Sequence, residues 1–134
     1  MKKLIFTVLA LLVTVQVCAQ ESDHVDVNGA KIYYEIHGEG SPLVLLHGFT
    51  MSHQMWKEDG WVEELSNDYQ LILVDLRGHG RSTNPSYEFT HRQSAIDIYA
   101  LMDSLDIYEF KAIGFSSGGM TLTHMAVMDT SRIE

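Results

Sequence analysis

The chain has 134 residues, of which 46% are hydrophobic and 20% charged, and this composition indicates one globular domain rather than a disordered segment or two ordinary domains. Its formal net charge is −9, so an acidic surface repels phosphate backbones and argues against nucleic acid as a partner. Cys18 is the only cysteine, which excludes a disulfide framework and a zinc–cysteine site within the chain.

The first residues have the pattern of a bacterial-type signal peptide. Lys2 and Lys3 precede an apolar run over residues 4–15, and Val17-Cys18-Ala19 offers small residues for cleavage after position 19. Twelve apolar residues span about 18 Å as a helix, short of the roughly 30 Å hydrocarbon core, so an uncleaved membrane anchor is the weaker alternative. We therefore expect residues 1–19 to be removed.

Lipid attachment at Cys18 is a third reading of this segment. Bacterial lipoproteins have a small residue just before that cysteine and usually Leu three before it, whereas this chain has Val17 and Val15. The better expectation is a periplasmic or secreted protein with no stable membrane insertion. Its mature chain, from residue 20 on, has no cysteine and so no cysteine nucleophile.

The mature chain opens with a predicted β-hairpin. After a polar lead-in at residues 21–24, the segments 25–27 and 31–36 flank Asn28-Gly29, in which both residues tolerate positive φ. A Gly-rich loop over residues 37–41 is expected to follow.

Two short and continuously apolar runs, residues 43–46 and 71–74, have the pattern of parallel strands buried on both faces. Between them residues 54–65 can form a helix, which Gly60 weakens. Residues 77–86 are rich in turn-forming residues.

A clearer helix begins at a capping box made by Thr90 and Gln93, and its apolar positions recur at helical spacing through Leu105. Residues 110–115 are predicted as a further apolar strand and residues 120–128 as a further helix. The order β-β-β-α-β-α-β-α indicates an α/β fold. We expect a mostly parallel sheet with the hairpin at one edge and flanking helices.

The motif that carries chemistry is Gly114-Phe115-Ser116-Ser117-Gly118, at the end of an apolar strand and the start of a helix. This is the setting of a nucleophile elbow, whose tight turn leaves no room for Cβ atoms at Gly114 and Gly118. A strand–turn–helix connection without chemistry is the alternative. The dinucleotide-binding fingerprint G-x-G-x-x-G does not match.

With two further segments the sequence resembles the α/β-hydrolase superfamily over nearly all of the mature chain. His47-Gly48-Phe49 closes the first buried strand where that superfamily places its oxyanion loop. The run from Asp75 to Ser82, DLRGHGRS, resembles the D-x-R-G-x-G-x-S turn that follows the next strand in many members. All three segments occur in the family's order. The serine at position 116 excludes the dehalogenase and epoxide-hydrolase branches, which use aspartate there.

The resemblance implies a role for each matching residue. Ser116 would attack a carbonyl carbon and form an acyl-enzyme. The backbone N–H groups of Phe49 and Ser117 would hold the oxyanion, and one such donor is worth roughly 10²–10³ in rate. His47 is expected to shape the loop, and Asp75 to belong to a structural turn rather than to a triad.

In this family the triad acid and histidine follow the nucleophile. The only histidine after Ser116 is His124, about 12 Å further along a helix, and Asp129 is further still, so neither is expected to act as base or acid. We therefore expect an N-terminal portion of a hydrolase domain, truncated on its C-terminal side, with an unpaired apolar edge strand at residues 110–115 and little activity of its own.

The expected substrate is a small carboxylic ester or related acyl compound, with no cofactor and no metal. A lactonase, a C–C bond hydrolase or a cofactor-free haloperoxidase on the same scaffold remains an alternative. So does a non-catalytic binding protein of the same fold. The oligomeric state is left open.

Overall fold

A computed structural model describes residues 21–134, so the predicted signal peptide at residues 1–19 lies outside the described part of the chain. Within that part, no helix has the length and apolar character needed to cross a membrane.

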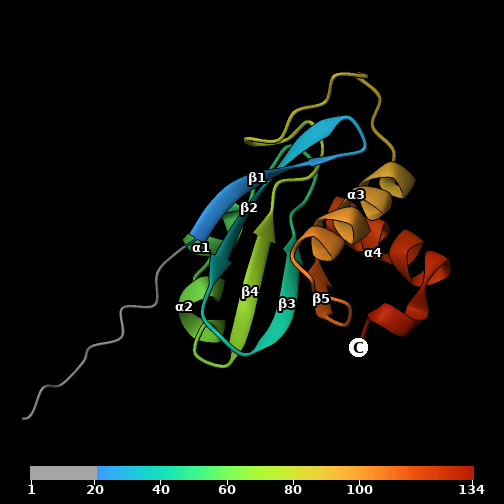
Figure 1. Cartoon of the computed structure of the whole chain (residues 1–134). Coiled ribbons are helices and arrows are strands. Elements are labelled where there is room, and N and C mark those ends of the chain that lie inside the picture. The colour runs from blue at the N-terminus through green and yellow to red at the C-terminus, as the bar shows by residue number, and fades with distance from the viewer. Residues whose placement is uncertain (1–20) are drawn as a thin grey trace, which may run out of the picture.

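One twisted sheet of five strands runs through the described chain, in the order β1-β2-β4-β3-β5 (Figure 1). The parallel strands β4, β3 and β5 form one side of the sheet, and the hairpin β1–β2 joins it antiparallel through β2 and β4. This confirms the predicted α/β fold, with the hairpin at one edge of the sheet. The strands are β1 (Glu21–Val27), β2 (Ala30–His37), β3 (Ser41–Leu46), β4 (Tyr69–Val74) and β5 (Lys111–Gly114).

Helices cover both faces of the sheet. In Figure 1, α3 and α4 lie together on one face, and α1 and α2 lie on the other. The helices are α1 (Gln54–Glu58), α2 (Trp61–Leu65), α3 (His91–Ser104) and α4 (Ser117–Met128), followed by a short 3₁₀ turn, η1 (Thr130–Arg132).

Three predicted boundaries were wrong. The polar lead-in at residues 21–24 is part of β1, because pairing with β2 satisfies its backbone whatever its side chains are. The single helix predicted for residues 54–65 is two short helices, since Gly60 adopts φ +79° and breaks the backbone direction. The last helix begins at Ser117 rather than at residue 120, because the elbow turns directly into it.

The two buried strands send alternate side chains to opposite faces. Val44, Leu46, Ile72 and Val74 pack under α3 and α4, in a core that includes Ile98 and Met102. Leu43, Leu45, Leu71 and Leu73 pack against Trp56 on the α1/α2 side. Apolar side chains therefore cover both faces of β3 and β4 and exclude water from them, which explains why the sequences of these strands are unbroken apolar runs.

A buried ion pair ties α3 to the hairpin turn. Arg77 donates to both carboxylate oxygens of Asp97, at 2.7 and 2.8 Å, and also to the carbonyl of Asn28 at 3.2 Å. The Asn28 amide completes the ring by donating to Asp97 at 3.0 Å. At the start of α3 the Gln93 N–H donates to Thr90 Oγ1 at 3.0 Å, which confirms Thr90 as the cap. The Gln93 side chain donates to Asp97 at 3.0 Å and, within residues 21–134, makes no return bond to the Thr90 N–H, so only half of the predicted capping box forms.

Strand β5 lies at the edge of the sheet, as expected, and its side chains are half-buried. Within residues 21–134, the pairing on the outer side is limited to Phe110, directly before β5, which forms a parallel bridge with Ile133. Phe110 donates to the carbonyl of Arg132 and accepts from the N–H of Glu134.

Candidate active site

Ser116 lies at a strained turn between β5 and α4. Its φ of 49° and ψ of −108° fall in a region that side chains rarely occupy, and the residue is exposed. A Cβ at Gly114 would lie 2.5 Å from the Gly118 backbone, and one at Gly118 would lie 2.1 Å from the Leu46 carbonyl oxygen. The crowding expected at both glycines is therefore present, and it lets strand, turn and helix meet this closely.

The elbow touches the loop that follows β3. The Phe115 N–H donates to the carbonyl of Leu46 at 2.9 Å, and a Cβ at Gly48 would lie 2.9 Å from the Phe115 ring. We call residues 48–53 the oxyanion loop. Within residues 21–134, neither the Phe49 nor the Ser117 backbone N–H donates a hydrogen bond, so both remain available to an incoming anion.

His47 is fixed in its neutral form at the base of this loop. It is fully buried, its Nδ1 donates to the Gly48 carbonyl at 2.7 Å, and its Nε2 accepts from the Leu76 N–H at 3.0 Å. Burial lowers the pKa of His47, although the hydrogen bond to Gly48 and the charge of Asp75 oppose that shift. Both ring nitrogens are occupied, so this histidine shapes the loop and has no free nitrogen to move a proton.

Asp75 is also fully buried and fully engaged. Its Oδ1 accepts from the N–H and the ring Nδ1 of His53, at 2.7 and 2.9 Å, and its Oδ2 accepts from the Arg81 N–H at 2.8 Å. The Ser82 hydroxyl donates to the backbone carbonyl of Asp75 at 2.7 Å. A carboxylate held by these donors organises a turn, as the sequence suggested.

No histidine within the described chain lies at hydrogen-bonding distance from the Ser116 hydroxyl. His124 is exposed on α4, and its ring stacks on that of His91, with centroids 6.4 Å apart. His91, which sequence reasoning missed, lies 3.5 Å from the Ser117 hydroxyl. Only the packing of α3 against α4 brings it there, so no local pattern could have indicated it.

Sequence reasoning also missed a group of aromatic rings beside the oxyanion loop. The rings of Phe49, His79 and Phe89 lie 5.3–5.8 Å apart, and Phe89 continues the group to His91 at 5.4 Å. Phe49 comes from the loop after β3, whereas His79 and Phe89 come from the segment that connects β4 to α3. They give this side of the site an apolar, aromatic wall.

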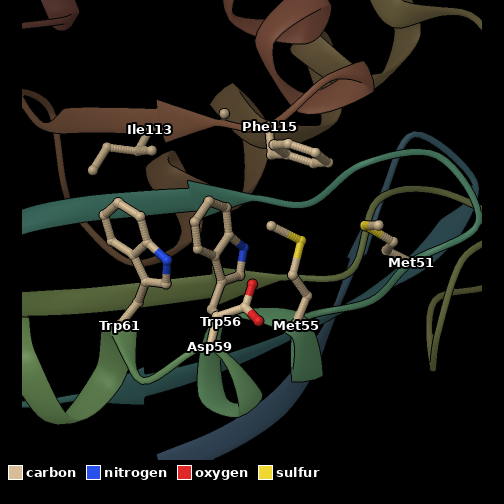
Figure 2. A pocket seen from close by; sticks show the side chains of 8 residues that line it. Met51, Met55, Trp56, Asp59, Trp61, Ile113 and Phe115 are labelled. Atoms are coloured by element: carbon tan, nitrogen blue, oxygen red, sulfur yellow. The ribbon is translucent and has the colours of Figure 1, made fainter.

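An apolar cavity of about 350 Å³ adjoins the elbow at Gly114 and Phe115. Figure 2 shows Trp61, Trp56 and Met55 rising from the α1/α2 segment toward Ile113 and Phe115. The elbow and the oxyanion loop each contribute to its lining, through Phe115 and Met51. Its remaining lining residues are Asp59 and Gly114.

The comparisons with known proteins agree with this geometry. The α/β-hydrolase fold family matches residues 41–134, and the chain belongs to that family. It is 37% identical over 94 residues to a non-heme chloroperoxidase of Streptomyces lividans, covering 69% of this chain and 34% of that protein. It is 33% identical over 103 residues to a pimeloyl-[acyl-carrier protein] methyl ester esterase of Legionella pneumophila, covering 77% of this chain and 39% of that protein.

Among solved structures, an epoxide hydrolase, CorEH, is 30% identical with a TM-score of 0.81, covering 87% of this chain and 40% of that one. Another relative, from Burkholderia sp, is named as a fluoroacetate dehalogenase. The chain is thus related to hydrolytic enzymes of several kinds. It spans little more than a third of the length of the curated relatives it matches.

Proposed function

We propose that the chain carries the nucleophile and the oxyanion donors of an exported serine hydrolase that cleaves carboxylic esters or related acyl compounds. The observation that carries this proposal is the conformation of Ser116, an exposed serine at φ 49° between two glycines that cannot hold a side chain. Such strain costs about 1–3 kcal/mol and persists mainly at functional sites.

In the proposed reaction the Ser116 oxygen attacks the carbonyl carbon of the ester while its proton passes to a base. The carbonyl oxygen becomes an oxyanion and accepts from the N–H groups of Phe49 and Ser117. Collapse of this intermediate breaks the bond to the alcohol oxygen, which leaves with the proton, and the acyl group stays on Ser116. Water then releases the acid and restores the serine.

Serine at position 116 favours acyl chemistry over epoxide or carbon–halogen cleavage, because the branches that perform those reactions resemble this chain but use aspartate there. The chloroperoxidase relative and a lactone-degrading structural neighbour, 32% identical with a TM-score of 0.76, support two related alternatives. Lactone opening and perhydrolysis would use the same nucleophile and the same donors.

For the whole protein, the proposal includes a triad acid and a triad histidine that lie after Ser116 in the sequence. The relatives are about twice as long as this chain, and in the family both residues follow the nucleophile. Export is proposed from the leader pattern of residues 1–19.

The test is labelling of the protein, expressed from its complete reading frame, with a fluorophosphonate probe. We expect one adduct, located on Ser116 by peptide mass spectrometry, and none in Ser116→Ala. No adduct on folded wild-type protein would overturn the enzyme proposal and favour a binding protein. Robust p-nitrophenyl acetate hydrolysis by the 134-residue chain alone, lost in Ser116→Ala, would overturn the inference that the base lies elsewhere.

A further inference from the structure

His53 ends the oxyanion loop and lies directly before α1. Its side chain is only 2% exposed, and it does not cap the helix. The ring instead turns toward the sheet, where it meets carboxylates from two different elements.

On one side His53 contacts Asp75, the residue that follows β4. Its backbone N–H and its ring Nδ1 lie 2.7 and 2.9 Å from the same oxygen, Oδ1. The other oxygen accepts from Arg81. Because an ionised carboxylate only accepts, Nδ1 of His53 must carry a proton. Asp75 therefore links the end of the oxyanion loop to the turn after β4.

On its other side the ring meets Glu35 of β2. His53 Nε2 lies 3.1 Å from Glu35 Oε1 and 2.8 Å from the amide nitrogen of Gln54. Glu35 is itself only 2% exposed, and it accepts from Tyr33 at 2.8 Å and from Lys57 at 3.0 Å. The ring thus lies between two buried carboxylates, one on β2 and one directly after β4.

The two ends of the oxyanion loop are fixed in the same way. His47 holds its start by bonding Gly48 and Leu76, and His53 holds its end by bonding Asp75. Between them Phe49 is exposed, and Thr50 adopts a positive φ of 64°. A turn inside the loop, closed by the Met51 N–H donating to the Gly48 carbonyl at 3.1 Å, acts together with these two anchored ends to set the loop's conformation.

We propose that His53 is a positioning residue, which holds the loop so that the Phe49 N–H meets the developing oxyanion. The proposal rests on the acyl-transfer function proposed above. A misplacement of about 1 Å can cost 10²-fold in rate, and losing one oxyanion donor costs about 10²–10³-fold. The effect should appear in kcat, because the N–H acts on charge that exists only in the transition state.

The experiment uses substitutions that keep one or the other ring contact. In His53→Asn the amide nitrogen takes the place of Nδ1 and keeps the bond to Asp75. In His53→Gln it takes the place of Nε2 and keeps only Glu35. His37→Asn is the matched control, because His37 also contacts Glu35, at 2.9 Å, but lies on β2 outside the loop.

In the protein expressed from its complete reading frame, we expect kcat for p-nitrophenyl acetate to fall about 10²-fold in His53→Ala and at least tenfold in His53→Gln, with KM changed less than threefold. His53→Asn should recover to within about threefold of wild type, and His37→Asn should stay within twofold. Full activity in folded His53→Gln would overturn the proposal, as would an Asn variant no better than the Gln variant.

Ring ¹⁵N NMR supplies a second readout. We expect a protonated Nδ1 on His53, and a ring protonated only at Nε2 would contradict the assignment to Asp75. The two proposals fail separately. If wild-type Ser116 takes no fluorophosphonate, the enzyme proposal fails, whereas a labelled wild type with equally reactive His53 variants removes only the positioning role.

Discussion

The buried carboxylate of Glu35 gives the sharpest test of the electrostatics around the site. Burial by itself raises the pKa of Glu35, but hydrogen bonds from His37, Tyr33 and Lys57 outweigh it and lower the pKa from 4.5 to about 2. The group is therefore easier to ionise in the folded state than in the unfolded one. Its contribution to stability is complete above about pH 4.5 and is lost as the pH falls through about 2.

The size of this contribution follows from the shift. A pKa lowered from 4.5 to about 2, at 1.36 kcal/mol per unit, corresponds to about 3 kcal/mol. Replacement by Gln removes the charge without changing the shape much. We expect Glu35→Gln to lower the free energy of unfolding by about 3 kcal/mol at pH 7, with the difference from wild type closing between pH 4.5 and 2.

Urea denaturation followed by circular dichroism at pH 7, 4.5, 3 and 2 measures this difference. Glu39→Gln is the control, because Glu39 is exposed and its charge should matter little at any pH. A difference between wild type and Glu35→Gln that stays constant from pH 4.5 to 2 would refute the reasoning. The stabilising effect of Glu35 would then not come from its ionisation.

Three further predictions concern stability and are measured by thermal or urea denaturation. Gly118→Ala should lower the free energy of unfolding by at least about 2 kcal/mol, because the added Cβ would meet the Leu46 carbonyl. Gly29→Ala, with open space around it, should lower it by only about 1 kcal/mol. Equal losses would contradict the steric argument. Ser116→Gly should be about 1 kcal/mol more stable than Ser116→Ala, because glycine adopts a positive φ without strain. Both variants should lose fluorophosphonate labelling. Equal stability of the two variants would mean that the turn is unstrained. Asp97→Ala should cost about 3–5 kcal/mol, because it leaves the Arg77 guanidinium buried without its carboxylate partner. Asp103→Ala should cost less than about 1 kcal/mol, because the Asp103 carboxylate is exposed and its buried partner Arg132 keeps its hydrogen bonds to the Ile107 and Tyr108 carbonyls. Similar small losses in the two variants would contradict the argument from burial.

Local patterns in the sequence carried most of the fold. Asn28-Gly29 predicted the hairpin because few residue pairs accept its backbone angles, and the unbroken apolar runs predicted strands covered on both faces. Helix ends were less certain. Gly60 indicated a weak point, but only the packing of Trp56 and Val62 on the sheet shows that two separate helices form there.

In the candidate site, the sequence alone was enough to predict the features that lie within a single turn of the chain. Gly114, Ser116 and Gly118 lie within five residues, so their spacing alone indicated the elbow and its crowding. The tertiary structure decided the contacts between distant segments: His53 between Glu35 and Asp75, and His91 beside Ser117. Those contacts join strands, loops and helices separated by 18 to 26 positions. Their partners are chosen by how the sheet and its layers pack, which no short pattern of residues encodes.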